Sequence, residues 1–504
     1  MTPSDGLSSF PTECGRMQNS DEKRWYVNER RKWWALAAVG SGVLVSTIDG
    51  SIVNIALNTL VQAFASNLNI VEWVVLGYLL TLACSLLIMG RLGDMYGKRR
   101  IYLIGFGLFT VASLLCATAP SIMALIAFRV LQGIGAAMIQ AVGPALLVTA
   151  FPSHERGLAL GAIGSFVAAG ILIGPALGGI LLRYVGWEAI FFVNLPIGVL
   201  GWWLTMRAIA PDQTMRPGQR FDLVGALLMA ATLFCLLLGL TEGPLWSWRD
   251  GRVIGLFGAA LIGSMLFIIW ELRYPQPMLQ LRIFRRLAFS LNLLAALVLF
   301  LGISFNLLLT PLFFQLVYQF DLQRTGFMLM SLPIALSLTS PISGRLSDRF
   351  GSRVLTIAGL IVTGLALLGL SFSTPTTPLP QMLGFLVLLG IGVGLFQSPN
   401  NSTILGNAPP EALGVASGLL AVVRNVGQTG GIALAGAVWA SQIFALNGGP
   451  VTPITAAPPT ILAGGYDVAM RVAALIAALA IVPSLFGGRA LQRQIVPVKQ
   501  PVAD

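Results

Sequence analysis

The sequence contains few charged residues. Asp, Glu, Lys and Arg make up 10% of its 504 positions, whereas hydrophobic residues make up 56%. A soluble domain carries roughly 25% charged residues. The apolar residues fall in long runs that recur along the chain. This scarcity of charge excludes an ordinary water-soluble protein and predicts an all-α polytopic membrane protein.

Cysteine and histidine are also scarce, which limits the chemistry available. The four cysteines are scattered, and the one histidine, His154, sits in a short loop. This spacing excludes a disulfide framework and a metal site. The sequence also lacks a nucleophile elbow and a phosphate-binding loop, so an enzyme and an ATP-driven pump are both disfavoured. We expect no metal and no cofactor.

Fourteen apolar runs are long enough to cross a bilayer as helices. With both chain ends placed in the cytoplasm, the connecting segments carry 24 Lys and Arg residues on the inner side and five on the outer side. This positive-inside bias accounts for the net charge of +11 without a nucleic-acid partner. No cleaved signal peptide is expected. The predicted spans lie near residues 34–62, 71–89, 101–118, 122–147, 157–182, 188–206, 223–241, 252–270, 287–314, 326–344, 354–372, 382–405, 413–443 and 466–487.

A charged motif after the second run occurs twice. GRLGDMYGKRR at 90–100 returns as GRLSDRFGSR at 344–353. A glycine pattern at 157–174 returns at 414–431. A duplicated unit with an insertion between its copies is a common plan in transporters. The expected domains are a cytoplasmic tail (1–32), a six-helix bundle (33–207), a two-helix linker insert (208–285), a second six-helix bundle (286–489) and a second cytoplasmic tail (490–504).

The first run contains a carboxyl group. Asp49, in IDGSIVNIAL, lies roughly 22 Å into the span, where a charge costs on the order of 3 kcal/mol. The functional interpretation is a group that binds and releases a proton, and the structural alternative is a hydrogen bond to a neighbouring helix. Ser51, Asn54 and Asn58 form a separate polar stripe, so this helix is expected to line a cavity.

The fourth and fifth runs carry two further candidates. Arg129, in LIAFRVLQGIGAA, is a permanent charge that must face a cavity or a carboxylate, and Asp49 is a partner of the right type. Gln132 follows at i+3. In the fifth run, GILIGPALGG, Pro175 bends the helix and the glycines allow a neighbouring helix to approach closely. These glycines are Gly170, Gly174, Gly178 and Gly179.

The repeated charged motif is interpreted as a conformational latch. Its glycines permit a tight turn, and Asp94 can accept hydrogen bonds from the start of the third helix or pair with an arginine. The alternative is a simple anchor to the inner membrane surface, which explains the Lys and Arg residues but not the repeated Gly–Asp–Gly spacing. The expected latch residues are Gly90, Arg91, Asp94, Gly97 and Arg99, with Asp348 in the copy.

Along nearly its whole length the chain resembles the fourteen-helix drug:proton antiporter branch of the major facilitator superfamily. The motifs described above carry the resemblance, together with ASGLLAVVRNVGQTGG at 416–431. The resemblance implies the major facilitator fold, with two bundles rocking around a midplane site while a proton enters and an amphiphilic compound leaves. It also implies that Asp49 and Arg129 couple transport to protons, and that GPxxGG in the fifth run marks an antiporter.

The expected function is therefore proton-coupled export of amphiphilic drugs or related lipophilic compounds across the cytoplasmic (inner) membrane. An exporter of a lipid or an endogenous metabolite with the same fold is the alternative. The expected partners are a small amphiphilic substrate, protons and membrane lipid; a periplasmic adaptor is left open. Few carboxyl groups besides Asp49 lie deep in the membrane, which favours a neutral, zwitterionic or monocationic substrate. Asn54, Gln132 and Arg424 are candidate cavity residues, and Arg424 either binds an anionic group or only bridges helices.

Overall fold

The computed structural model describes residues 29–212, 219–449 and 457–486. In these parts of the chain, fourteen helices are long and apolar enough to cross a membrane, which confirms the predicted all-α architecture with fourteen spans. Apolar segments form helices in lipid because a helix satisfies its backbone N–H and C=O groups within one segment. Most of the expected first tail (1–32) and all of the second (490–504) lie outside the described residues.

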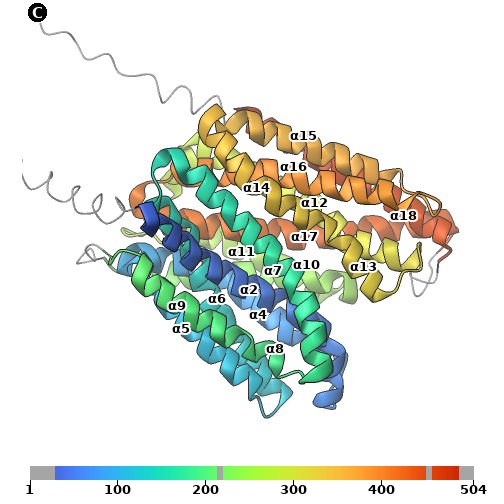
Figure 1. Cartoon of the computed structure of the whole chain (residues 1–504), viewed down its shortest axis with the longest axis horizontal. Helices are drawn as coiled ribbons and strands as arrows, with labels where there is room; N and C mark the ends of the chain where they lie inside the picture. The colour runs from blue at the N-terminus through green and yellow to red at the C-terminus, as the bar shows by residue number, and fades with distance from the viewer. Residues whose placement is uncertain (1–28, 213–218, 450–456, 487–504) are drawn as a thin grey trace, which may run out of the picture.

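The first six spans form one bundle, the N-bundle, coloured blue to green in Figure 1. Two of these spans are each divided in two by a short break, at Glu72 and at Val193. The elements are α2 (Glu29–Ala63), α3 (Leu68–Val71), α4 (Trp73–Tyr96), α5 (Lys98–Ala117), α6 (Ile122–Ala150), η1 (Ser153–Glu155), α7 (Arg156–Tyr184), α8 (Ala189–Phe192) and α9 (Asn194–Ala208).

The last six spans form the C-bundle, and two inserted helices precede it. The final helix begins at Pro459, earlier than the predicted start at 466, because Pro at a first helical position favours initiation there. The inserted helices are α10 (Leu223–Trp246) and α11 (Gly251–Arg273). The C-bundle elements are η2 (Leu281–Arg285), α12 (Leu287–Leu316), α13 (Leu322–Leu329), α14 (Ser331–Phe350), α15 (Ser352–Ser371), α16 (Leu379–Gly406), η3 (Pro410–Ala412), α17 (Leu413–Asn447) and α18 (Pro459–Leu479).

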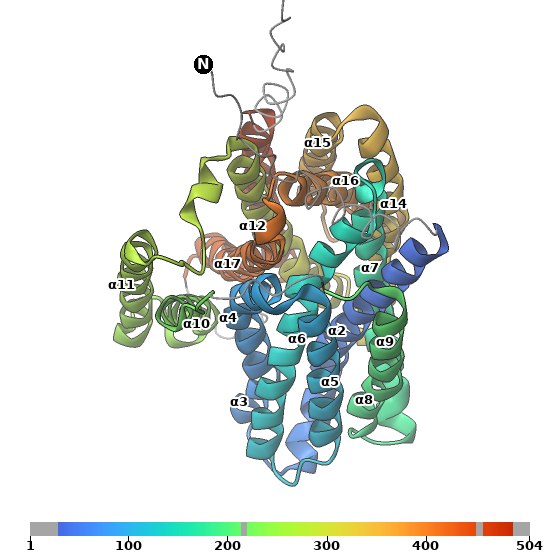
Figure 2. The same ribbon diagram turned by 90° about the vertical axis from the view of Figure 1, so that its left-hand side faces the viewer.

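The inserted helices lie at the edge of the molecule, beside α4 and α17 (Figure 2). Asp222 caps the N-terminus of α10 by accepting from the N–H of Gly225, and it also accepts from Nε1 of Trp270 in α11. Glu271 accepts from the N–H of Leu279 beyond the end of α11. These bonds tie the two inserted helices to each other and to the segment that enters the C-bundle.

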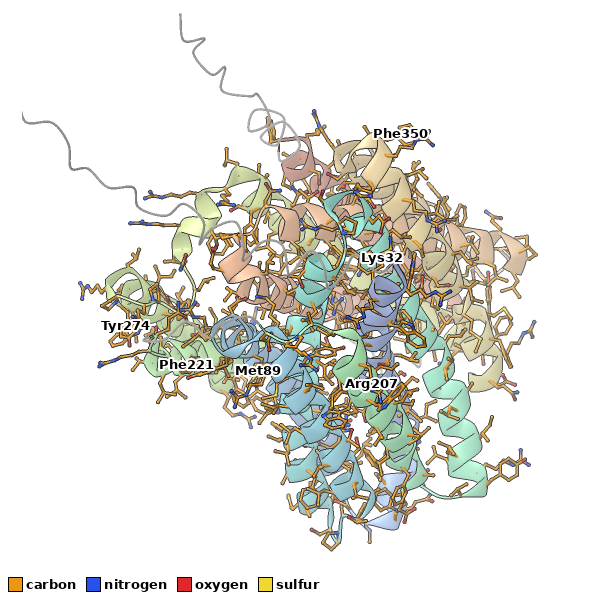
Figure 3. The ribbon with its side chains drawn as sticks, turned by 60° about the vertical axis from the view of Figure 1, so that its left-hand side comes forward. Lys32, Met89, Arg207, Phe221, Tyr274 and Phe350 are labelled. Carbon is orange, nitrogen blue, oxygen red and sulfur yellow. The ribbon has the colours of Figure 1, made fainter. Side chains whose placement is uncertain are left out.

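The two bundles meet at one end of the molecule, which we call the latch end. There α4 packs on α17 and α7 packs on α14, with Gly90 against Gly414 and Gly157 against Gly344. The latch end comes forward in Figure 3, where Met89 is labelled in α4 and Phe350 at the end of α14. Toward the opposite, distal end the helices of the two bundles diverge (Figure 1).

The turn inside the charged motif consists of a single residue. α4 continues to Tyr96 and α5 starts at Lys98, so only Gly97 lies between them, with φ at +103°. Gly351 makes the same turn in the copy, with φ at +88°. A left-handed φ is open to glycine and strained for residues with a Cβ, so one residue suffices to reverse the chain.

The start of α5 is capped by a residue outside the motif. The backbone N–H groups of Arg99 and Arg100 donate to the carboxylate of Asp212, at 3.0 and 2.9 Å. The guanidinium of Arg99 donates to the carbonyl of Met206 at 2.8 Å. The expectation that Asp94 caps this helix is therefore wrong, because Asp212 from the connector after α9 occupies that position.

Candidate functional site

A fully buried polar network joins three helices of the N-bundle. One carboxylate oxygen of Asp49 (α2) accepts from Nη1 of Arg129 (α6) at 2.7 Å. The other oxygen accepts from Nε2 of Gln132 (α6) at 2.9 Å and from Nδ2 of Asn194 (α9) at 2.8 Å. All four residues are buried away from solvent. The predicted pairing of Asp49 with Arg129 is thus present in the structure.

Two further helices hold the other groups of this network. Nε of Arg129 donates to the carbonyl of Val74 in α4 at 3.0 Å, and its guanidinium lies over the ring of Tyr78, 4.1 Å from the ring centroid. Nε2 of Gln132 also donates to Oγ of Ser113 in α5, at 2.7 Å. The network therefore connects α2, α4, α5, α6 and α9, so a change at Asp49 alters contacts among all of these helices.

The hydrogen bonds define the charge of the network in this conformation. All three partners of Asp49 donate to it, an arrangement that suits an ionised carboxylate beside the charge of Arg129. Among the described residues, the hydroxyl of Tyr78 and the amide oxygen of Asn194 have no hydrogen-bond partner. Because Asp49 faces the bundle interior, proton exchange at this group requires these helices to repack.

The polar stripe of α2 lies on a different face, as predicted. Asn54 is exposed and its amide donates to the carbonyl of Gly50, while Asn58 is also exposed. A role for Asn54 in a substrate cavity therefore stays a prediction. The same expectation for Gln132 does not hold in this conformation, because its amide is fully used inside the Asp49 network.

Sequence reasoning did not single out Tyr78, Ser113 or Asn194. Each is an uncharged polar residue in a predicted span that also holds other polar residues, and none has a special spacing from Asp49. A search for uncharged polar residues inside predicted spans would have found them, but helix periodicity alone does not say which helices meet. Buried polar groups need hydrogen-bond partners, so a polar residue inside a predicted span indicates that a partner lies on a neighbouring helix.

The duplication makes it possible to find the C-bundle counterparts of this network. A Cβ on Gly133 of α6 would meet the carbonyl of Tyr78 in α4, and one on Gly390 of α16 would meet the carbonyl of Leu332 in α14. Each contact marks the point where two helices cross. The two crossing points are equivalent, since the repeated charged motif already pairs α4 with α14. They align Tyr78 with Leu332 and Gly133 with Gly390.

Two more pairs of crossings align the remaining helices. A Cβ on Gly135 would meet the backbone nitrogen of Phe109 in α5, and one on Gly392 would meet that of Thr363 in α15. A Cβ on Gly174 of α7 would approach the carbonyl of Ile48 in α2. The equivalent contact joins Gly431 of α17 to the carbonyl of Leu301 in α12. These contacts align α5 with α15 and α2 with α12.

In the C-bundle the counterparts that these contacts identify for five residues of the network are apolar. Gly302 stands where Asp49 stands, Leu332 replaces Tyr78, Leu367 replaces Ser113, Leu386 replaces Arg129 and Leu389 replaces Gln132. The last three leucines are fully buried in the core. The same crossing is thus built without charge, and a buried ion pair seldom stabilises a fold more than apolar residues of similar volume do. Packing alone does not explain the network.

Two carboxylates cross between the bundles at the latch end. Asp94 of α4 accepts from the backbone N–H groups of Gly414 and Val415, at the start of α17, at 2.8 and 2.9 Å. Lys98 Nζ lies 2.9 Å from the same carboxylate. We call this set the first latch. It uses the positive end of a helix dipole to bind an aspartate of the other bundle.

The second latch is the counterpart of the first. Asp348 of α14 accepts from the backbone N–H groups of Gly157 and Leu158, at the start of α7, at 2.9 and 3.0 Å. Each copy of the charged motif therefore grips the first turn of a helix in the opposite bundle. Gly90 lies in close contact with Gly414, which leaves no space for a side chain there. Arg91, also in the first copy, is buried beside the segment 278–286 that leads into the C-bundle.

We predict that Asp94→Asn slows transport more than it weakens substrate binding. An amide keeps the size of the side chain but accepts poorly from two N–H groups, and each charge-assisted bond contributes roughly 1.5–3 kcal/mol. Initial export rates should fall about tenfold or more, with the dissociation constant changed less than about threefold. The matched control is Asp212→Asn, which also removes a carboxylate from two backbone N–H groups but within one bundle. Equal effects of the two substitutions on turnover would disprove the latch.

Helix α7 contacts the C-bundle with one part and α2 with another. Near its start it packs on α14 through Gly157, Gly161 and Gly164. Farther along, Pro175 lies within the part that packs on α2. Gly179 is different, because it is exposed and no atom lies within 4 Å of its Cβ position. The α2 contacts in this second part are Gly170 and Gly174 against Thr47, Ile48 and Ser51, and Gly178 against Ile52.

These contacts predict opposite outcomes for two glycines of one motif. A Cβ on Gly170 would lie 2.6 Å from Cβ of Thr47. Gly170→Ala therefore forces α2 and α7 apart and should cost about 1–3 kcal/mol. Gly179→Ala meets open space and should leave stability unchanged or slightly raised. Thermal unfolding of the two purified variants measures the difference. Equal melting temperatures would show that the α2–α7 contact does not require a glycine at 170.

Arg424 of α17 lies outside both the network and the latches. It lines a small cavity between the bundles, with residues from α6, α7, α12 and α16 on the other walls. Its counterpart in α7, aligned through Gly157 and Gly414, is the apolar residue Val167. The cation is therefore a feature of the C-bundle, as the carboxylate of Asp49 is a feature of the N-bundle.

Two related six-helix bundles, with a charged network in one of them, are the architecture of a secondary transporter. The sequence pattern of the Major Facilitator Superfamily matches residues 39–432. The chain therefore belongs to this superfamily.

Named relatives support the drug-efflux branch predicted from the motifs. The multidrug resistance protein Stp of Mycobacterium tuberculosis (strain CDC 1551 / Oshkosh) is 36% identical over 417 residues, which cover 82% of this chain and 77% of that protein. The riboflavin transporter RibZ of Clostridioides difficile (strain 630) is 32% identical over 398 residues, which cover 79% of this chain and 86% of RibZ. The predicted superfamily is confirmed, and the relatives named for drug resistance support its drug-efflux branch.

Solved structures show the same fold at low sequence identity. The human organic anion transporter MFSD10 (TETRAN) superposes with a TM-score of 0.61 at 15% identity, over 91% of this chain and 99% of that chain. This likeness supports the major facilitator fold, and at this identity it carries no information on substrate.

Proposed function

We propose that this protein is a proton-coupled exporter of amphiphilic compounds, in which Asp49 carries the proton. The observation that carries the proposal is the ionised network of Asp49 and Arg129, which is built in one bundle and replaced by apolar residues in the other. The positive-inside bias supports a cytoplasmic latch end and a distal end that faces outside. The described conformation is then closed to the cytoplasm, and an external proton reaches the buried carboxylate of Asp49 when the helices around it repack.

Protonation of Asp49 changes the energy of its surroundings strongly. A neutral Asp49 no longer balances Arg129, and a buried charge that loses its partner is destabilised by about 3–5 kcal/mol. The protonated carboxyl also needs an acceptor, which the free amide oxygen of Asn194 provides once that amide rotates. The network therefore has two arrangements, and the proton selects between them.

The rearrangement reaches the latches through α7. A shift of α2 moves the part of α7 that packs on Thr47 and Ile48, and the first turn of α7 holds Asp348 of the C-bundle. Loss of that contact weakens the second latch and favours separation of the bundles at the cytoplasmic end. External protonation thus favours the state that takes up substrate from inside, which is the order an exporter requires.

A growth screen in cells that lack their own drug exporters tests this function. Cells that express the protein, its Asp49→Asn variant or an empty vector are grown with a panel of amphiphilic compounds. We expect the intact protein alone to protect against at least one compound, and the protection to disappear when the proton gradient is collapsed. Equal protection by the Asp49→Asn variant would contradict proton coupling through this residue.

Export of an endogenous metabolite is a second candidate function. It is supported by the similarity to RibZ, whose name describes riboflavin transport, along most of both chains. Including riboflavin and other planar metabolites in the same panel, with intracellular content as the readout, separates the two candidates.

A further inference from the structure

The cavity between the bundles carries an unbalanced positive charge. Of the described residues that line it, only Arg424 is charged, and the amides of Gln140, Gln397 and Asn401 supply the main polar groups. The hydroxyl of Ser417, on the same wall, is buried without a hydrogen-bond partner among the described residues. Apolar residues of α7 and α12 complete the lining. The cavity thus combines one cation, several neutral polar groups and an apolar wall.

Arg424 differs from Arg129 of the buried network in its partners. Arg129 is matched by a carboxylate at 2.7 Å, whereas no hydrogen bond or ion pair within the described residues involves Arg424. A guanidinium held between two helix bundles is costly unless an anion or several acceptors meet it. The interpretation of Arg424 as a structural bridge between helices would require such a partner on α6, α7 or α16.

We propose that Arg424 binds the acidic group of the transported compound, which is a carboxylate, phenolate or sulfonate on an amphiphilic skeleton. This rests on the proposed transport function and adds an acidic group to the substrate, so of the neutral, zwitterionic and monocationic classes favoured by the sequence only the zwitterionic class is retained. Gln397 and Asn401, one turn apart on α16, donate amide N–H groups to the same anion, while Phe300 offers an apolar surface to the skeleton. A guanidinium is suited to this role because its fork of donors matches an oxyanion.

The cavity is too small in this conformation for a drug-sized substrate, so we expect the substrate to enter in another conformation. About 50 Å³ is open between these side chains, enough for a few water molecules. Ligand sites for drug-sized molecules measure roughly 300–1,000 Å³. The cavity lies a few helical turns from Gly414 of the first latch, so separation of the bundles at the latch end would widen it toward the cytoplasm. Binding is therefore expected when the latches open.

The charge of the cavity can be measured without knowing the substrate. In the full chain with its four native cysteines replaced by serine, Gln397→Cys is labelled with an anionic reagent, 2-sulfonatoethyl methanethiosulfonate, and a cationic one, the 2-trimethylammonioethyl analogue. Adding Arg424→Gln should lower the ratio of anionic to cationic labelling rates about tenfold, because a unit charge at this range dominates the local potential. The control Arg471→Gln, at an exposed cation paired with Asp467, should leave the ratio unchanged.

A matched pair of ligands then tests the substrate class. Rhodamine B carries a free carboxylate and its ethyl ester does not, so binding of both to the purified full chain is followed by fluorescence polarisation. We expect the acid to bind more tightly, and Arg424→Gln to weaken the acid about tenfold or more while changing the ester less than about twofold. Equal loss for both ligands, no binding of the acid, or a labelling ratio insensitive to Arg424 would overturn the proposal. Neither assay depends on proton transport, so their failure is separate from failure of the coupling function.

Discussion

Asp49→Asn is expected to abolish export driven by a proton gradient while the protein remains folded. Asparagine cannot gain or lose a proton, so the network is left in one charge state. Its amide oxygen still accepts from Arg129, and the amide of Asn194 can rotate to present its free oxygen to the new NH₂ group, while the oxygen of Gln132 continues to accept from Arg129. The protein should therefore stay folded, at a lower stability because Arg129 loses its counter-ion, and the loss of function should concern energy coupling.

The measurement uses purified protein in proteoliposomes with a compound identified by the growth screen. Uphill transport under an imposed pH gradient should fall by about a hundredfold or more, because the step that needs a proton cannot occur. Exchange of labelled for unlabelled compound at equal concentrations should continue. Asp467→Asn, which removes an exposed carboxylate paired with Arg471, serves as the control and should transport normally. Uphill transport by Asp49→Asn at the rate of the control would show that another group carries the proton.

Arg129→Leu is expected to cause the largest loss of stability of any substitution in the network. It introduces the residue found at the equivalent C-bundle position, Leu386, yet it leaves the carboxylate of Asp49 buried without its counter-ion. Removing one partner of a buried pair costs about 3–5 kcal/mol. Thermal unfolding of the detergent-purified protein should shift downward by several degrees, and the control Arg183→Leu, near the distal end of α7, should shift it little.

A second substitution separates charge from packing. Asp49→Asn combined with Arg129→Leu removes both charges, so it should recover at least half of the stability lost in Arg129→Leu alone. The double variant should remain unable to couple transport to protons. If the two effects on stability simply add, the two side chains do not interact energetically and the ion pair is not what holds the network together.

Much of the fold could be predicted because lipid imposes simple rules. Apolar run length defined the fourteen spans, and the repeated charged motif showed the duplication. The pairing of Asp49 with Arg129 could be inferred because two opposite charges inside spans need each other. The positions of Ser113 and Asn194 in the same network could not be inferred, because an uncharged polar residue in a span has many possible neighbours.

The sequence predicted which residues form the latches but not the residues that they contact in the opposite bundle. Asp94 and Gly414 lie far apart in the sequence. The acceptor of a backbone N–H group cannot be identified from residue types, so this pairing is visible only in the structure. For the glycines of GILIGPALGG, helix geometry alone could have predicted which of them share a face of the helix. Gly170, Gly174 and Gly178 recur at every fourth position and share a face, whereas Gly179 lies about 100° away from Gly178 around the helix.

Proton release on substrate binding tests the central claim most directly. Purified protein in weakly buffered detergent solution is mixed with a transported compound, and the pH change is followed with an indicator dye near the pH at which the protein exchanges protons. The account predicts that the intact protein releases about one proton for each bound molecule and that Asp49→Asn releases none while still binding. Equal release by the two proteins would contradict it, because the exchanged proton would then reside on a group other than Asp49.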